Sequence, residues 1–335
     1  NKALYEKNNG YYMNKNPIGN KSDFITSPYI SIMFSEMIAV WLISFWEKIG
    51  RPKNINIIEL GAGNGEMMLQ ILKTIEKFNN FKSSSNFFIY EKSSYLKKLQ
   101  KNKIKFENVK WISSLTKISK FPSIFIANEF FDALPIKQLV KKGKKWYEKN
   151  VKYSRSKAPI FLDKLINIKK FEKKIGFEIS NKQNFVEYSP LSIKYLKFIS
   201  KIIKNKTGGL LIIDYGYTDE KMKNTLKSIS KHKMSNVLEN FGKSDISYDI
   251  NFKLIEKIVK KFGLKVNGIT SQKRFLQELG ILERAEIISK NLPFSKKANI
   301  YLRLKKLMDE NAMGKLFKVM FISKKNMKFK IGFNN

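Results

Sequence analysis

The chain has 335 residues, of which 43% are hydrophobic and 13% aromatic, so it can bury a sizeable core and is not a disordered protein. It has no cysteine, which excludes disulfides, thiolate metal sites and cysteine nucleophiles. Its single histidine, His232, leaves little room for a histidine-based metal site or catalytic triad.

The formal net charge of +37 does not by itself predict a nucleic-acid partner. Only five of the 65 basic residues are arginines, and the lysines are scattered along the whole chain among many Asn and Ile. A nucleic-acid interface usually concentrates basic residues on one face and favours arginine. A drift towards AT-rich codons explains the lysine surplus more simply, so we expect a partner other than nucleic acid.

The first predicted element in chain order is an apolar helix. The segment Ile30–Trp46 is interrupted by Glu36 and is shorter than the ~20 residues that a membrane span needs. Its apolar positions form a broad helical stripe. The segment therefore predicts a buried amphipathic helix and no transmembrane segment.

Short apolar segments then alternate with segments of helical pattern. Helices are expected at 66–78 and 93–102, and the stretch KFNNFKSSSN is expected to be a polar loop. We predict strands at 54–60, 87–91, 109–113, 123–127 and 210–214. Alternating strands and helices are typical of an α/β protein with a parallel sheet and helices on both faces.

About eighty residues separate the fourth and fifth predicted strands, far more than an ordinary crossover connection requires. They include a hairpin that turns at Gly143 and a helix at 191–204, which together indicate an insertion over one edge of the sheet. After residue 252 the pattern predicts a helix, a strand at 263–270, further helices and a last strand at Phe317–Ser323.

A glycine-rich loop follows the first predicted strand, in the stretch IELGAGNGEMM. Gly61, Gly63 and Gly65 would let the backbone approach a nucleotide-like ligand at the start of the next helix. The spacing departs from the dinucleotide pattern G-x-G-x-x-G, because no glycine or alanine stands at its last position. Glycines alone do not identify the ligand, since any strand–turn–helix connection can carry them.

Two carboxylates beside this loop favour a cationic ligand. Glu59 precedes the first glycine by two residues and suits a sulfonium or ammonium group better than a pyrophosphate. Glu91 ends the second predicted strand, where it can accept hydrogen bonds from ribose hydroxyls. These residues point to S-adenosylmethionine as the cofactor, and therefore to a methyltransferase.

A family resemblance rests on four stretches of the chain. They read GYYMNKNPIGNKSDFITSPYISIMFSEMIAVW, IELGAGNGEMM, ANEFFDALPIKQLV and LLIIDYGY. In this order they resemble the MidA-like family of class I S-adenosylmethionine-dependent methyltransferases, which includes a mitochondrial protein arginine methyltransferase that assists respiratory complex I assembly. The resemblance covers nearly the whole chain. One departure is Asp249, which stands where the family usually has a histidine.

The resemblance implies a Rossmann-like fold with a mostly parallel seven-stranded sheet, helices on both faces, an N-terminal cap and insertions. It divides the chain into a cap or lid at 1–50 and a methyltransferase domain at 51–335. Within that domain we expect an insertion at about 138–205 and a helical C-terminal elaboration at about 220–312.

The resemblance also implies the site residues. Cofactor contacts are expected from the loop that holds Asp23 and from Gly61, Gly63, Gly65 and Glu91, to which the charge argument above adds Glu59. The acceptor site would involve Asn128, Glu129 and Asp132. A carboxylate can pair with a guanidinium bidentately and orient its nitrogen, and Glu129 is the first choice for that role.

A structural reading of the same residues stays open. The stretch EFFDALP could be the start of a helix, with Asp132 as its cap and Phe130 and Phe131 in the core.

The expected activity is methylation of an arginine in a protein substrate, such as a complex I core subunit or its bacterial counterpart. The expected location is a bacterial cytoplasm, or the mitochondrial matrix if the source is eukaryotic. An RNA methyltransferase and a non-catalytic, cofactor-binding assembly factor are the alternatives, with an NAD-linked dehydrogenase a distant fourth. The oligomeric state is open, and a homodimer is one possibility.

Overall fold

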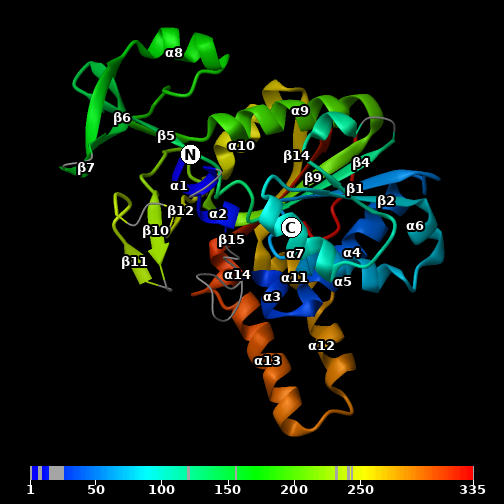
Figure 1. Cartoon of the computed structure of the whole chain (residues 1–335). Coiled ribbons are helices and arrows are strands. Elements are labelled where there is room, and N and C mark those ends of the chain that lie inside the picture. Colours follow the sequence, from blue (N-terminus) through cyan, green and yellow to red (C-terminus); the bar gives the residue numbers. More distant parts are fainter. Residues whose placement is uncertain are drawn as a thin grey trace.

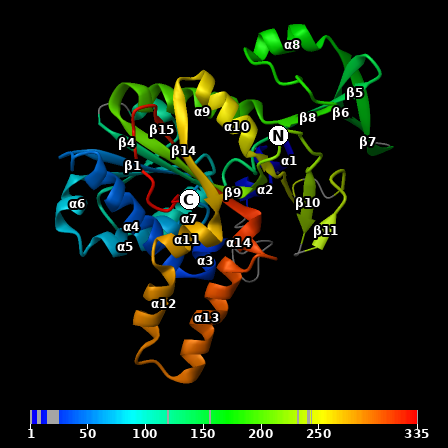
Figure 2. The same ribbon diagram turned by 180° about the vertical axis from the view of Figure 1, so that it is seen from behind.

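The computed structural model describes residues 2–6, 10–14, 26–118, 121–154, 157–230, 233–239, 242 and 244–334. A central sheet carries helices on both faces, and three further units extend from it (Figures 1 and 2). These units are a four-stranded sheet with a helix, a small three-stranded sheet, and a long helical hairpin.

The central sheet has the strand order β14-β15-β9-β4-β1-β2-β3, and the short β13 (Ile250–Asn251) pairs with β9. Its strands are β1 (Ile55–Leu60), β2 (Ser85–Tyr90), β3 (Val109–Ile112), β4 (Ser123–Asn128), β9 (Gly208–Tyr217), β14 (Leu264–Ser271) and β15 (Phe317–Lys324). Adjacent strands from β3 to β9 are parallel, and β15 is antiparallel to both of its neighbours. The predicted α/β fold with a mostly parallel seven-stranded sheet is confirmed.

Alternate residues of the central strands enter two separate hydrophobic clusters, one on each face of the sheet. In β1, Ile57 belongs to one cluster and Ile58 to the other, and Ile124 and Phe125 of β4 divide in the same way. Because both faces are covered, these strands consist of nearly continuous apolar residues and do not alternate with polar ones. This pattern is why the strands could be predicted from the sequence.

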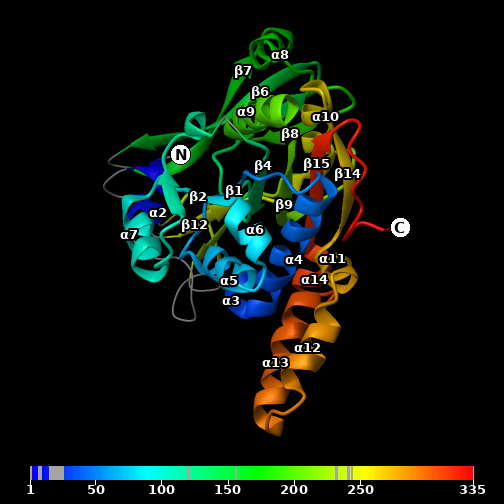
Figure 3. The ribbon, with the colours of Figure 1, turned by 90° about the vertical axis from the view of Figure 1, so that its right-hand side faces the viewer.

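The helices divide between the two faces (Figure 3). The face that holds Ile57 carries α3 (Ser27–Ile30), α4 (Ile32–Lys48), α5 (Glu66–Ile75) and α6 (Asn79–Ser84). The opposite face carries α9 (Pro190–Lys206) and α10 (Phe252–Lys261). The shorter α7 (Ser94–Lys103) and the 3-10 turn η1 (Leu115–Lys117) lie in the connections around β3.

The predicted apolar helix near the N-terminus is confirmed as α4, whose start is capped by the Ser31 hydroxyl, which accepts a hydrogen bond from the Met33 amide. The prediction of a polar loop for KFNNFKSSSN was wrong. This stretch contains α6, because Phe81 is buried in the core and Ser84 and Ser85 bond back to carbonyls one turn earlier.

The long connection between β4 and β9 forms the second sheet, in the order β7-β6-β5-β8. It consists of β5 (Lys137–Lys142), β6 (Lys145–Ser154), β7 (Lys157–Ile166), α8 (Ile168–Ile175) and β8 (Phe185–Tyr188). The hairpin turns at Gly143, which has a φ of 57°. The predicted hairpin is therefore present.

The remaining units follow β9. A small sheet contains β10 (Lys227–Ser230), β11 (Lys233–Ser235) and β12 (Asp245–Ser247). After β14 come α11 (Gln272–Glu278), α12 (Ile281–Ser289), α13 (Phe294–Met308) and α14 (Met313–Leu316). At the N-terminus, the short helices α1 (Lys2–Tyr5) and α2 (Tyr11–Asn14) contact β12 and α7 respectively. No helix among the described residues is long and apolar enough to cross a membrane.

Candidate active site

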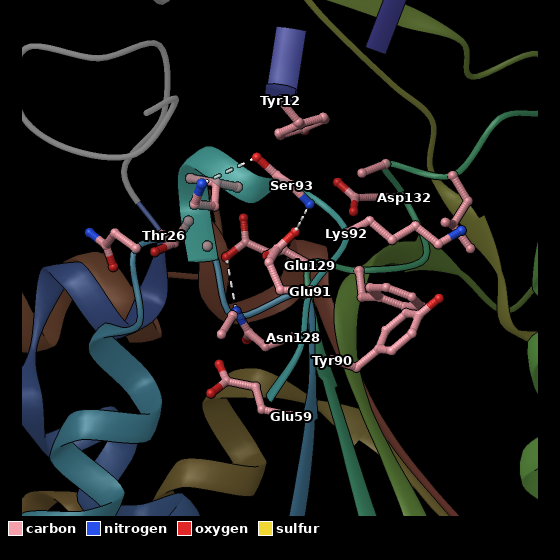
Figure 4. A pocket seen from close by; sticks show the side chains of 18 of the residues that line it. Tyr12, Thr26, Glu59, Tyr90, Glu91, Lys92, Ser93, Asn128, Glu129 and Asp132 are labelled. Carbon is pink, nitrogen blue, oxygen red and sulfur yellow. Dashed lines mark hydrogen bonds between the residues drawn. The ribbon is translucent and has the colours of Figure 1, made fainter. Parts of the chain in front are cut away.

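A cavity of about 340 Å³ lies at the carboxyl ends of β1, β2, β4 and β9. The strands β2 and β4 flank β1 on opposite sides, so the connections that follow β1 and β4 diverge and leave a crevice between them. The helices α1 and α2 contribute Tyr5 and Tyr12 to the cavity wall. Figure 4 shows Glu59, Glu91, Glu129 and Asp132 around one space, with Tyr12 across that space from Glu59.

The glycine loop turns in a conformation that favours glycine at three positions. Gly61, Gly63 and Gly65 have φ values of 67°, 53° and 79°. A side chain at Gly61 would also collide with a neighbour, because its Cβ would lie 2.8 Å from Cδ2 of Phe130. Asn64 fixes the end of the loop, since its Oδ1 accepts a hydrogen bond of 3.1 Å from the Glu66 amide at the start of α5. The spacing of the glycines therefore follows from this backbone geometry.

Glu59 is a buried carboxylate beside the loop. Its Oε2 atom has no hydrogen-bond partner among the described residues. Burial, and secondarily the negative charge of Glu91, raises the pKa of Glu59 to about 8. A buried carboxylate oxygen without a partner costs free energy, so Oε2 is suited to receive a donor or a cation from a bound molecule.

Glu91 is held in one orientation by its neighbours. Its Oε1 accepts a hydrogen bond of 2.8 Å from the Ser93 amide, and its Oε2 accepts one of 3.1 Å from Nε2 of Gln100. Gln100 also donates to the carbonyl of Gly63 and accepts from Nε1 of Trp111. One amide side chain thus ties Glu91 to the glycine loop and fixes the distance between them.

The turn after β4 places Glu129 at the cavity. Glu129 has a φ of 50°, which is a strained conformation for a residue other than glycine. Its Oε2 accepts a hydrogen bond of 3.0 Å from the Tyr215 hydroxyl, and its Oε1 accepts one of 3.4 Å from Nδ2 of Asn128. Burial raises the pKa of Glu129 to about 7 although these two hydrogen bonds act in the opposite direction.

Asp214, in the second half of β9, holds this turn in place. Its fully buried carboxylate accepts hydrogen bonds from the amides of Phe131, at 3.1 Å, and Asp132, at 3.3 Å. The turn from 129 to 134 is consequently not helical, and the alternative of a helix start at EFFDALP was wrong. Phe131 is buried in the core, whereas Phe130 lines the cavity and packs against Tyr195.

Asp132 and Asp245 bring two more carboxylates to the same cavity. Oδ1 of Asp132 is buried and has no hydrogen-bond partner among the described residues. Burial, followed by the negative charges of Asp214 and Glu129, raises the pKa of Asp132 well above its ordinary range. Asp245 of β12 accepts a hydrogen bond of 2.7 Å from the Tyr12 hydroxyl. No pattern in the sequence indicates this contact between residues 233 positions apart.

The cavity is acidic although the chain is strongly basic. Its wall carries one basic residue among the described positions, Lys92. Its carboxylates are Glu59, Glu66, Glu91, Glu129, Asp132 and Asp245. The 65 lysines and arginines of the chain are therefore largely excluded from the cavity, which suits a ligand with positive charge.

Eight of the nine predicted site residues lie together. Seven line the cavity, namely Glu59, Gly61, Gly63, Glu91, Asn128, Glu129 and Asp132. Gly65 lies one turn further on, at the start of α5. Asp23 and the histidine His232 fall outside the described residues, although Thr26 and Pro28, at the start of α3, reach the cavity.

The structure adds residues that the sequence did not single out. Tyr5, Tyr12 and Asp245 line the cavity and come from the N-terminal helices and the small sheet. Asp249, which departs from the family pattern, lies outside the cavity wall and forms an ion pair of 2.5 Å with Lys227.

Comparison with known proteins gives a consistent result. Residues 37–270 match a protein family described as "Putative S-adenosyl-L-methionine-dependent methyltransferase". The chain is 27% identical to the mitochondrial protein arginine methyltransferase NDUFAF7 of Xenopus tropicalis, over 92% of this chain and 77% of that protein. It is 28% identical to the Drosophila melanogaster homologue, over 93% and 77% of the two chains.

A solved structure has the same fold. It is that of a COG1565 superfamily protein from Burkholderia thailandensis bound to S-adenosyl-homocysteine. The two chains are 21% identical, with a TM-score of 0.80 over 99% of this chain and 86% of the other.

Proposed function

Because the chain belongs to the S-adenosylmethionine-dependent methyltransferase family that its residues 37–270 match, we propose that it methylates an arginine side chain of a protein. The observation that carries this proposal is the acidic cavity in a basic chain, in which Glu129, Asp132 and Asp245 face one space. A guanidinium is a planar cation with five N–H donors and matches carboxylates on several sides. The relatives named as protein arginine methyltransferases support the same acceptor.

The residues on the β1–β2 side of the cavity fit the cofactor. The glycine loop leaves room for close approach, and Glu91 is held ready to accept hydrogen bonds from ribose hydroxyls. The unpartnered oxygen of Glu59 suits the cationic methionine end. When bound, S-adenosylmethionine supplies an electrophilic methyl group on a sulfonium sulfur. We propose that Glu59, Gly61, Gly63, Gly65 and Glu91 hold it, together with the loop around Asp23.

The residues on the β4–β9 side fit the acceptor. We propose that Glu129 accepts two hydrogen bonds from the guanidinium and orients the attacking nitrogen, while Asn128 and Asp132 accept the remaining N–H groups through their unpartnered buried oxygens. The nitrogen gains a methyl group and loses a proton. Glu129 can take that proton, because its pKa of about 7 is close to neutral pH.

An RNA substrate is disfavoured by the same geometry. RNA would bring phosphates to the cavity mouth, where six carboxylates line the wall and Lys92 is the one basic residue among the described positions. Like charges at close range oppose such binding.

We propose that the acceptor is a core subunit of respiratory complex I or its bacterial counterpart, and that the protein acts in a bacterial cytoplasm or in a mitochondrial matrix. The word "mitochondrial" in the names of the relatives supports this location. We retain the division into a lid at 1–50 and a catalytic domain at 51–335 as part of the same proposal.

The test is a methylation assay with labelled S-adenosylmethionine and a purified complex I core subunit, followed by mass spectrometry of the labelled peptide. Label on arginine that is lost in Glu129→Gln and kept in Glu148→Gln would support the proposal. Glu148 is a matched control because it pairs with Lys137 outside the cavity wall. Label on another residue type, or an unchanged rate in Glu129→Gln, would refute the acceptor assignment.

A genetic test distinguishes a methyltransferase from a non-catalytic assembly factor that only binds the cofactor. If Glu129→Gln binds the cofactor normally and still restores complex I assembly in a strain that lacks the protein, methyl transfer is not the function that assembly requires.

A further inference from the structure

The helices α12 and α13 form a hairpin that projects away from the sheet and the cavity (Figures 1 and 3). Its base is fixed to the body of the protein. Arg284 of α12 donates two hydrogen bonds, of 2.9 and 2.7 Å, to the carboxylate of Glu36 on α4. Arg303 of α13 donates one of 3.1 Å to the carbonyl of Ile30 on α3. The hairpin is therefore a fixed arm whose position relative to the cavity is defined.

The tip of this arm is apolar. Phe294, the first residue of α13, is 87% exposed, and Leu292 in the connecting turn is 37% exposed. Further along α13, Leu302 is 63% exposed and follows Phe294 by eight residues, so both side chains lie on one face of the helix. The side that packs within the arm uses different residues, such as Leu304 and Leu307, which are buried. Neither contact within the arm nor contact with the body covers Phe294.

The tip of the arm and α13 are also basic, whereas α12 carries the acidic residues Glu283 and Glu286. Between Ile287 and Met308 the sequence contains six basic residues and no acidic one. These basic residues are Lys290, Lys296, Lys297, Arg303, Lys305 and Lys306. Lys290, Lys296 and Lys297 flank the apolar tip, are exposed, and form no ion pair with any described residue.

These features favour an anionic partner with an apolar interior. A second copy of the chain could cover Phe294, but it would bring the lysines of two tips together, and this repulsion opposes self-association. An anionic bilayer satisfies both features, because lysines attract its headgroups while aromatic and aliphatic side chains enter the boundary with the acyl chains.

We propose that the tip of the α12–α13 arm binds an anionic membrane surface, with Leu292 and Phe294 inserted and Lys290, Lys296 and Lys297 against lipid headgroups. This contact is peripheral, since no helix among the described residues can cross a membrane. It goes beyond the methyltransferase activity and does not depend on it.

The test is sedimentation of the full chain with vesicles of phosphatidylcholine alone or with phosphatidylserine added. We expect binding to the anionic vesicles, weakened by salt. Phe294→Ser should weaken it about tenfold or more, from the loss of one buried aromatic side chain. Changing Lys290, Lys296 and Lys297 together to Gln should weaken it by about two orders of magnitude, because each lysine contributes about a factor of five.

Matched controls lie on the unit formed by the four-stranded sheet and α8. Tyr153→Ser removes a side chain of β6 that is 69% exposed, and changing Lys169, Lys170 and Lys173 to Gln removes the same charge from α8. If these controls weaken binding as much as the arm variants, general basicity explains the binding and the proposal fails.

Tryptophan fluorescence tests directly whether the tip enters the bilayer. In Phe294→Trp, we expect an additional blue-shifted fluorescence signal on anionic vesicles and quenching by brominated lipids. Absence of both changes overturns the proposal. So does light scattering that shows a dimer in solution which Phe294→Ser dissociates, because the apolar tip would then be a contact between two copies.

Discussion

Replacing Gly61 by alanine should impose two separate costs that the structure allows us to assign. The first is backbone strain, because φ is 67° at this position, and a residue with a Cβ pays about 1–2 kcal/mol there. The second is a collision, because the new Cβ would lie 2.8 Å from Cδ2 of Phe130, and overpacking of this kind costs about 1–3 kcal/mol. Gly61→Ala should therefore lower the free energy of unfolding by about 2–5 kcal/mol.

Two further variants separate these costs. Gly143→Ala has a similar φ of 57° and no atom within 4 Å of its added Cβ, so it should show the backbone cost alone. In a double-mutant cycle, Phe130→Ala should remove the collision from Gly61→Ala and leave the backbone cost.

The assay is urea denaturation, combined with calorimetry of S-adenosylmethionine binding. Gly61→Ala should also weaken S-adenosylmethionine binding, since the glycine loop must move to relieve the contact with Phe130. If Gly61→Ala and Gly143→Ala destabilise equally, or if Phe130→Ala recovers nothing, the collision does not exist and the proposed close approach of loop and ring is wrong.

Three other predictions address the chemistry. Glu129→Gln should reduce kcat about 10²–10³-fold while the Kd of S-adenosylmethionine changes less than about twofold, and a normal kcat would remove Glu129 from the mechanism. Asp245→Asn, whose amide oxygen can still accept from Tyr12, should raise KM for an arginine peptide and leave cofactor binding unchanged. Weaker binding of S-adenosylmethionine would instead show that Asp245 contributes to the cofactor site. The raised pKa of Glu59 means that the folded chain holds its proton up to about pH 8. Without cofactor, the free energy of unfolding should then fall by at least about 1 kcal/mol as pH rises from about 4.5 to 8. In Glu59→Gln, the denaturation midpoint should not show this fall with pH.

Local signals in the sequence were sufficient to predict the parallel part of the sheet and the residues that line the β1–β2 side of the cavity. Strands buried on both faces are continuous apolar segments, and Gly61 and Glu91 follow such strands directly. Their place at one edge of the sheet then follows from the parallel topology.

The side of the cavity that we propose for the acceptor could be predicted only in part. Glu129 follows a strand, but its orientation depends on Asp214 and Tyr215 of a strand more than eighty residues later. Tyr12 and Asp245 meet through a contact between the N-terminus and a small sheet, and no periodicity or spacing indicates such a contact. The helix α6 within KFNNFKSSSN was missed because one buried side chain, Phe81, outweighs the polar composition around it.

The positions in the sequence that supply the cavity wall affect how the protein substrate can change during evolution. Apart from the loop around Asp23, the residues proposed to hold the cofactor lie between Glu59 and Glu91, in one continuous part of the sequence. Those on the proposed acceptor side come from separate segments around Tyr12, Glu129, Tyr215 and Asp245. Substitutions in those segments can alter which protein is modified without touching the donor site. Relatives with the same donor loop can therefore diverge in substrate by exchanging short segments at the rim, and chimaeras made at these boundaries should keep cofactor affinity while they change partner.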